Sequence, residues 1–130
     1  ETFCLKKLLI MPKLILLPTF KDKRGSLTVI EKIIPFEIKR VYFIYNSEGN
    51  KRGFHKHKLT KQALLATSGS CSVFVKNSKN TLKYNLDSPS KCLILDPEDY
   101  HWMNNFKKET VLLVLASEFY DINDYLDNDL

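Results

Sequence analysis

The sequence has few of the features that mark disulfide-stabilised, membrane-spanning or nucleic-acid-binding proteins. Its three cysteines, Cys4, Cys71 and Cys92, are odd in number and widely spaced, which favours buried free thiols in a reducing compartment. No apolar run approaches the roughly 18 residues of a membrane span. The basic residues are scattered, without an arginine-rich helix or lysine run, so the net charge of +5 favours an anionic small molecule over nucleic acid.

The sequence also lacks signs of disorder, of a second domain or of a secretory leader. Its 130 residues are 44% hydrophobic, which is enough for one core and excludes a disordered chain. Pro12 and Lys13 interrupt the apolar opening, and no small-residue cleavage site follows. We therefore expect a soluble, cytoplasmic protein with a single domain over residues 1–130, in which residues 1–10 are an extension outside the core.

Short apolar segments of four to seven residues do recur along most of the chain, with turn-forming residues between them. This pattern predicts an all-β fold, a small antiparallel β-barrel or jelly roll. The tail differs, because its apolar residues are spaced for a short C-terminal helix or an extended arm. The predicted strands are residues 14–17, 26–31, 38–45, 53–58, 63–68, 70–76, 81–85, 91–95 and 111–117.

Two of the three histidines, His55 and His57, lie one residue apart in a predicted strand. Alternate residues of a strand share a face, so the two imidazoles point to the same space. If that space is the barrel interior, partial desolvation tunes the rings for proton transfer near neutral pH. The alternative from this pair alone is a chance arrangement on the surface.

The surrounding spacing favours the interior. The stretch resembles the first motif of the cupins, G-x5-H-x-H-x4-E-x6-G, from Gly49 through His55 and His57 to Gly69, with Gln62 in place of the usual glutamate. A looser match to the second cupin motif, "KCLILDPEDYHWMNN", contributes His101.

Metal-dependent cupins hold a transition metal with such histidines and the glutamate, whose carboxylate supplies negative charge. Gln62 is neutral and a poorer ligand, so we favour a metal-free acid–base site without a cofactor. A metal-dependent enzyme with a zinc site of His55, His57 and His101 stays as an alternative. A non-catalytic carbohydrate-binding cupin is the other alternative.

Several further blocks, in order, are similar to the sugar 3,4-ketoisomerases of the WxcM-like cupins. They are "DKRGSLTVIE", "IPFEIKRVYFIYN", "RGFHKHK", "LLATSGSCSV", "LDSPSKCLILDPEDYHWMNNF" and "VLLVLASEFYDINDY". The resemblance implies an RmlC-like β-barrel that forms a homodimer, often by exchanging N-terminal strands. It also implies conversion of dTDP-4-keto-6-deoxyglucose to a galacto- or gluco-configured 3-keto isomer, which feeds the synthesis of 3-amino-3,6-dideoxysugars for surface glycans.

Keto migration needs removal of the C3 proton, stabilisation of an enediolate and protonation of C4. We assign His55 as the principal base and His57 as its partner in orienting the hydroxyl or shuttling a proton. The hydrogen-bond donors expected around the enediolate are Tyr42, Gln62 and His101.

The diphosphate requires cations, and Arg24 and Arg52 lie beside glycines that allow the backbone to approach a ligand closely. Arg52 is three residues before His55, so in a regular strand it would point to the opposite face. A β-bulge at the following glycine would bring it to the histidine face. Lys23 and Lys58 are further candidates for the diphosphate, and Trp102 for stacking on thymine.

Overall fold

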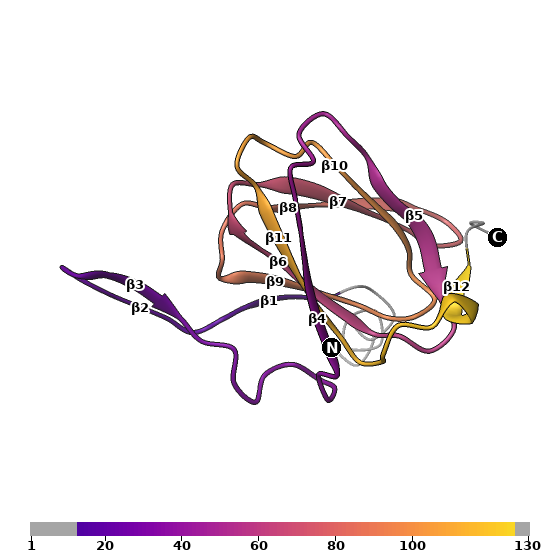
Figure 1. Cartoon of the computed structure of the whole chain (residues 1–130), viewed down its shortest axis with the longest axis horizontal. Coiled ribbons are helices and arrows are strands. Elements are labelled where there is room, and N and C mark those ends of the chain that lie inside the picture. Colours follow the sequence, from indigo (N-terminus) through magenta and orange to yellow (C-terminus); the bar gives the residue numbers. More distant parts are fainter. Residues whose placement is uncertain (1–12, 127–130) are drawn as a thin grey trace.

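The computed structural model describes residues 13–126, which form two five-stranded antiparallel sheets packed face to face beside a separate two-stranded hairpin (Figure 1). One sheet has the strand order β1-β9-β6-β11-β4 and the other β12-β5-β10-β7-β8, while β2 and β3 form the hairpin. The strands of the first sheet are β1 (Lys13–Leu16), β9 (Lys91–Leu95), β6 (Gln62–Ser68), β11 (Val111–Ala116) and β4 (Arg40–Tyr45). Those of the second are β12 (Tyr125–Leu126), β5 (Arg52–His57), β10 (Tyr100–Asn104), β7 (Cys71–Lys76) and β8 (Thr81–Leu86), and the hairpin is β2 (Thr19–Asp22) and β3 (Gly25–Thr28).

The main core fills the space between the two sheets. Side chains alternate along each strand, so one residue in two contributes to this core. In β6, for example, Leu64 and Ala66 face the second sheet, and Gln62 has the same parity at the open end of the core. The other buried members of this core are Cys71, Val73, Val75, Leu86, Leu93, Leu95, Met103, Phe106, Leu112 and Val114.

A second apolar cluster lies on the outer face of the first sheet. Ala63 and Leu65 of β6 face it, and the irregular segment of residues 29–39 packs over them through Ile33 and Phe36. β6 is therefore buried on both faces for most of its length. This explains why its sequence is a continuous apolar run instead of an alternating one.

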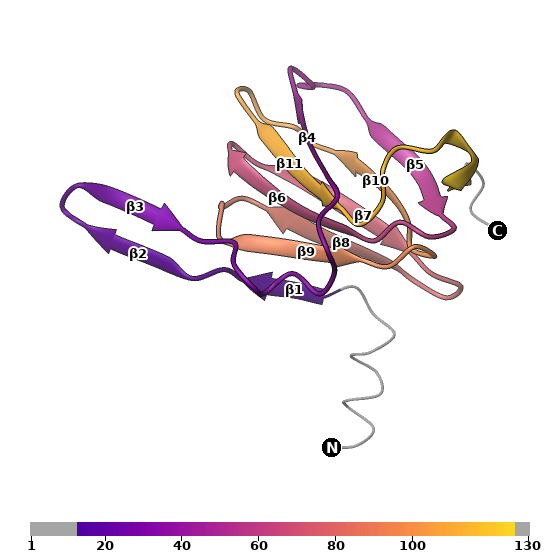
Figure 2. The ribbon, with the colours of Figure 1, turned by 60° about the horizontal axis from the view of Figure 1, so that its bottom comes forward.

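The β2–β3 hairpin projects away from the two sheets (Figure 2). Phe20 and Leu27, which are partners across the hairpin, are 64% and 59% exposed. Lys23 and Arg24 form its turn, where Arg24 makes an exposed ion pair with Asp22.

The all-β prediction is confirmed, and each predicted strand overlaps an observed one. The sequence did not predict β2, β10 or β12. The C-terminal segment forms a single 3-10 turn, η1 (Ile122–Asp124), followed by β12, so the extended arm is the alternative that the structure supports. Cys71 and Cys92 are buried free thiols, whereas Cys4 and the expected extension of residues 1–10 lie outside the described residues. Among residues 13–126 no helix has the length and apolar character needed to span a membrane.

Candidate active site

A cavity of about 480 Å³ opens at one end of the space between the sheets. Strands of both sheets contribute to its wall, and the C-terminal arm closes one side. Its polar and aromatic lining includes Arg40, Tyr42, Arg52, His55, Gln62, His101, Tyr120 and Tyr125.

The three histidines form a cluster beside this cavity, and two of them, His55 and His101, line it. The ring of His55 lies 5.1 Å from that of His57 and 5.0 Å from that of His101, centroid to centroid, and edge-on to both. His57 and His101 are 5% and 2% exposed, while His55 is half-buried and lines the cavity. The ring of Tyr125 from the arm contacts both His55 and His57, at 5.0 and 4.6 Å.

A β-bulge in β5 brings Arg52 to the same cavity as His55. His101 pairs with His55, but Trp102 pairs with Gly53, so two residues of β5 oppose one step of β10. The parity of the strand changes at this bulge, and both Arg52 and His55 line the cavity. The bulge that the sequence required for Arg52 is therefore present.

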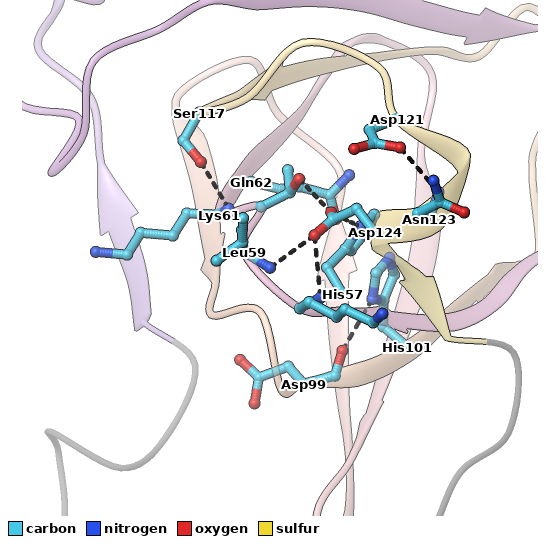
Figure 3. Close-up of polar contacts among 12 residues, drawn as sticks. His57, Leu59, Lys61, Gln62, Asp99, His101, Ser117, Asp121, Asn123 and Asp124 are labelled. Carbon is cyan, nitrogen blue, oxygen red and sulfur yellow. Dashed lines mark hydrogen bonds and ion pairs between the residues drawn. The ribbon is translucent and has the colours of Figure 1, made fainter.

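The buried carboxylate of Asp124 fixes the orientation of His57 (Figure 3). Its Oδ2 lies 2.9 Å from Nδ1 of His57. Because a carboxylate only accepts hydrogen bonds, Nδ1 carries the proton and Nε2 carries the lone pair. That Nε2 atom is buried and has no hydrogen-bond partner among the described residues.

Asp124 also receives hydrogen bonds from the turn that follows β5. The backbone N–H of Leu59 donates to Oδ1 at 2.7 Å, and the hydroxyl of Thr60 donates to Oδ2. Burial by itself would raise the pKa of Asp124, but these hydrogen bonds and that of His57 outweigh it, so the pKa lies below its ordinary value. The carboxylate therefore stays ionised and ties the arm to the histidine strand.

Sequence reasoning missed Asp124 and Tyr125, because they lie in the tail, outside both cupin motifs. The available signal was an acidic residue between apolar residues in "DINDYL", since an acid in an apolar stripe needs a buried partner.

Burial lowers the pKa of both inner histidines. For His57, desolvation outweighs the opposing effect of Asp124, and for His101 it lowers the pKa to about 3. Nδ1 of His101 lies 3.1 Å from the backbone oxygen of Asp99, so Nδ1 donates and Nε2 is again the acceptor. Both rings are therefore neutral at physiological pH, as proton acceptors must be.

Tyr42 and Gln62 form a hydrogen-bonded pair on the cavity wall, where Nε2 of Gln62 donates to the tyrosine oxygen at 3.0 Å. Burial raises the pKa of Tyr42, so the phenol keeps its proton. Since its oxygen already accepts from Gln62, the O–H is available to donate elsewhere. Oε1 of Gln62 is buried and has no hydrogen-bond partner among the described residues.

Other expected substrate-binding residues lie away from the cavity within the single chain. Lys23 and Arg24 are at the tip of the projecting hairpin, and Lys58 is exposed beyond the end of β5. Trp102 faces the outside of the second sheet, where it stacks on Phe54. These four residues therefore lie outside the cavity of the single chain. The other expected residues lie close to the histidine pair, namely Tyr42, Arg52, Gln62 and His101.

Arg40 also lines the cavity, although it was not among the residues expected from the sequence. Its guanidinium lies 4.4 Å from the ring centre of Tyr42 and 5.2 Å from that of Tyr120. Arg40 is two residues before Tyr42 in the same strand, so the two side chains share a face, and this spacing could have identified it. Two guanidinium groups, of Arg40 and Arg52, therefore face one cavity.

The alternative of a metal site receives no support from the donor geometry. Within residues 13–126, no three histidine, cysteine, aspartate or glutamate side chains are grouped so that they could hold a metal ion. Asp124 is directed at Nδ1 of His57, and Gln62 at Tyr42.

Comparison with known proteins places the chain among the relatives that these motifs suggested. Residues 11–129 match the family model described as FdtA: WxcM-like, C-terminal. The chain belongs to this family. It is 44% identical over 108 residues to a TDP-4-oxo-6-deoxy-alpha-D-glucose-3,4-oxoisomerase from Aneurinibacillus thermoaerophilus, covering 81% of this chain and 78% of that protein.

Solved structures of the family agree with this fold. A double mutant of the QdtA 3,4-ketoisomerase from Thermoanaerobacterium thermosaccharolyticum, in complex with TDP, is 43% identical, with a TM-score of 0.87 over 90% of this chain and 87% of that one. Another mutant of the same enzyme, in complex with TDP-4-keto-6-deoxyglucose, is 40% identical, with a TM-score of 0.84 over the same shares. The rmlC epimerase of Mycobacterium tuberculosis, at 16% identity and a TM-score of 0.77 over 88% of this chain and 66% of that one, shares the fold, which confirms the RmlC-like prediction.

Proposed function

We propose that this chain is a sugar 3,4-ketoisomerase that converts dTDP-4-keto-6-deoxyglucose to a dTDP-3-keto-6-deoxyhexose without a metal or other cofactor. The family and the named activities of its relatives support the reaction class. The observation that carries the proposal is the histidine cluster at the cavity, with His55 lining it and His57 held by Asp124.

The reaction moves two hydrogens and leaves the atomic composition unchanged. His55 removes the proton from C3, the C3–H electrons form a C3–C4 double bond, and the C4 carbonyl electrons move to O4. The resulting enediolate is protonated at C4 by the same imidazolium, while the O3 proton is lost and the C3 carbonyl forms. His57 takes the O3 proton through Nε2 and returns it to O4, which becomes the 4-hydroxyl group of the product.

Other residues of the cavity wall bind the substrate. The O–H of Tyr42, whose oxygen accepts from Gln62, donates to the enediolate oxygen. Nε2 of His101 and Oε1 of Gln62 accept hydrogen bonds from sugar hydroxyls. Arg40 and Arg52 bind the diphosphate, because a guanidinium matches two phosphate oxygens at once.

The test is to incubate the protein with dTDP-4-keto-6-deoxyglucose in deuterated water and to follow the carbonyl position and deuterium incorporation by NMR. We expect a 3-keto product, with no loss of rate after exhaustive chelation of metals. His55→Asn and His57→Asn should each abolish conversion while the affinity for TDP stays within a few-fold of the original. Absence of both keto migration and deuterium uptake in the unmodified protein would overturn the assignment.

We also infer that the chain forms a homodimer through its projecting hairpin. Phe20 and Leu27 on the hairpin are exposed, as are Val41, Phe43 and Tyr45 on the outer face of the edge strand β4. A second copy would cover these apolar side chains and the open strand edge. In the single chain β1 pairs with its own β9, so the exchanged element we propose is the hairpin.

The dimer would give the hairpin tip a function. Lys23 and Arg24 would lie at the cavity of the second copy and contact its diphosphate, as the sequence suggested. Sedimentation should show a dimer for the unmodified protein and a monomer for the double variant Phe20→Asp, Leu27→Asp. Ser26→Asp, which adds a charge to the hairpin at a neighbouring position, is the matched control and should remain dimeric.

The proposed substrate and product also suggest a cellular setting. A 3-keto sugar is a substrate for an aminotransferase, which would give a 3-amino-3,6-dideoxysugar for surface glycans. Since nucleotide sugars are made in the cytoplasm, we place the reaction there. A test is to add the deuterium-labelled 3-keto product and an amino donor to a cell extract. The label should then appear in a 3-amino sugar.

A further inference from the structure

The bulge in β5 contains an unusual backbone conformation at Phe54. Gly53 and Phe54 have φ angles of +98° and +65°, and together they oppose the step from His101 to Trp102 in β10. Glycine adopts positive φ readily, but phenylalanine does so rarely. Something must therefore hold Phe54 in this conformation.

A row of stacked side chains on the outer face of the second sheet provides that restraint. The ring of Phe54 lies 5.7 Å from that of Trp102 with planes 6° apart, and Trp102 lies 5.3 Å from Phe74 with planes 9° apart. Lys83 of β8 extends the row over Phe74. Trp102 pairs across the strands with Gly53, and the ring of the next residue, Phe54, stacks on it.

The same bulge controls the inner face of the strand. In a regular strand, Arg52 and His55 would point to opposite faces, since three positions separate them. With the extra residue at Gly53–Phe54, both line the cavity. A Cβ at Gly53 would lie 3.1 Å from the backbone oxygen of His101, so the first residue of the bulge must be a glycine.

We propose that Phe54 is a positioning residue for the isomerase site. Its stack on Trp102, outside the cavity, holds the bulge that places the base His55 and the diphosphate ligand Arg52 in one cavity. This inference rests on the proposed function for the roles of these two residues, but the placement of His55 is measurable without turnover.

The experiment compares Phe54→Ala with Phe74→Ala in the full chain. Each removes one ring from the row, but Phe74 lies on β7, which is separated from the bulged strand β5 by β10. For Phe54→Ala we expect kcat to fall at least roughly tenfold and the Kd for TDP to rise at least roughly fivefold, because His55 and Arg52 both shift. Phe74→Ala should lower the melting temperature but keep both constants within about twofold. Phe54→Tyr, which retains the ring, should restore both constants.

The imidazole signals of His55 in the NMR spectrum give a readout that does not depend on catalysis. They should move in Phe54→Ala and stay in place in Phe74→Ala and Phe54→Tyr. If Phe54→Ala does not fold, Phe54→Leu, which keeps an apolar side chain of similar size without a ring, takes its place. Unchanged His55 signals, kcat and Kd in the folded variant would overturn the inference, whereas shifted signals in a protein without isomerase activity would overturn only the proposed function.

Discussion

At the scale of single residues, the site depends on hydrogen bonds that fix where protons reside. Asp124 accepts from Nδ1 of His57, and the Asp99 carbonyl accepts from Nδ1 of His101, so each ring presents a lone pair at Nε2. Desolvation keeps both rings neutral. One acidic residue in the arm thus determines the protonation pattern of a histidine on another strand.

Asp124→Asn tests this dependence. Asparagine can still accept from His57 but brings no charge, so we expect kcat to fall by roughly 10²-fold while the affinity for TDP is unchanged. Because Asp124 raises the pKa of His57, its loss should move the acidic limb of the pH–rate profile to lower pH. Asp121→Asn, the same change at an exposed cap of η1, is the control and should keep the original profile. An Asp124→Asn enzyme with the original kcat and profile would contradict this role.

Tyr42→Phe tests the donor on the cavity wall. Removing the hydroxyl removes the proposed hydrogen bond to the enediolate and leaves the Gln62 amide without its partner. We expect a loss of roughly 10² in kcat, with a smaller change in the affinity for TDP. Tyr100→Phe removes a hydroxyl from a residue that does not line the cavity and should be nearly neutral. Equal rates for the two variants, measured under saturating substrate, would exclude Tyr42 as the donor.

At the scale of elements, two pieces of irregular backbone complete the site. The bulge in β5 changes the parity of the strand, and the arm from residue 117 to 126 brings Tyr120, Asp124 and Tyr125 against β5 and the cavity. Regular strands alone would present either Arg52 or His55 to the cavity, not both.

Gly53→Ala should therefore cost more stability than Gly49→Ala. Both glycines have positive φ, so both substitutions strain the backbone. A Cβ at Gly53 would also press on the backbone of His101 and Trp102 at 3.1 Å, whereas none at Gly49 meets an atom within 4 Å. We expect an additional loss of roughly 1–2 kcal/mol in the free energy of unfolding for Gly53→Ala, measured with urea. Equal losses would mean that β10 yields to the added methyl group.

At the scale of the whole molecule, the two sheets enclose His101 so completely that its titration is linked to folding. Its folded-state pKa, lowered by burial to about 3, lies below the value of about 6.5 in the unfolded chain. Its stabilising contribution is therefore fully present above about pH 6.5 and is lost as the pH falls towards 3. Acid should unfold the protein in part by protonating this ring.

His101→Gln isolates the effect. Below about pH 6, the free energy of unfolding of the wild-type protein should fall by about 1.4 kcal/mol more per pH unit than that of the variant. This is the slope expected when unfolding takes up one proton. Urea unfolding between about pH 5 and pH 8 measures the difference. Burial raises the pKa of Asp99 to about 6, so this residue makes the protein less stable as the pH rises, the opposite trend. Because Asp99 is present in both proteins, its effect cancels in the difference between them. Parallel stability curves would show that His101 does not titrate on unfolding.

The sequence by itself determined the all-β fold, the shared face of His55 and His57, the inward position of Gln62 and the need for a bulge beside Arg52. These properties depend on strand alternation and on residues close together in the chain, so local patterns contain them. Only the tertiary structure joined Asp124 to His57, turned Arg40 to the cavity and placed Trp102 outside it. Such contacts join residues far apart in the chain, and the packing of the arm and of the two sheets, which no local pattern encodes, determines them.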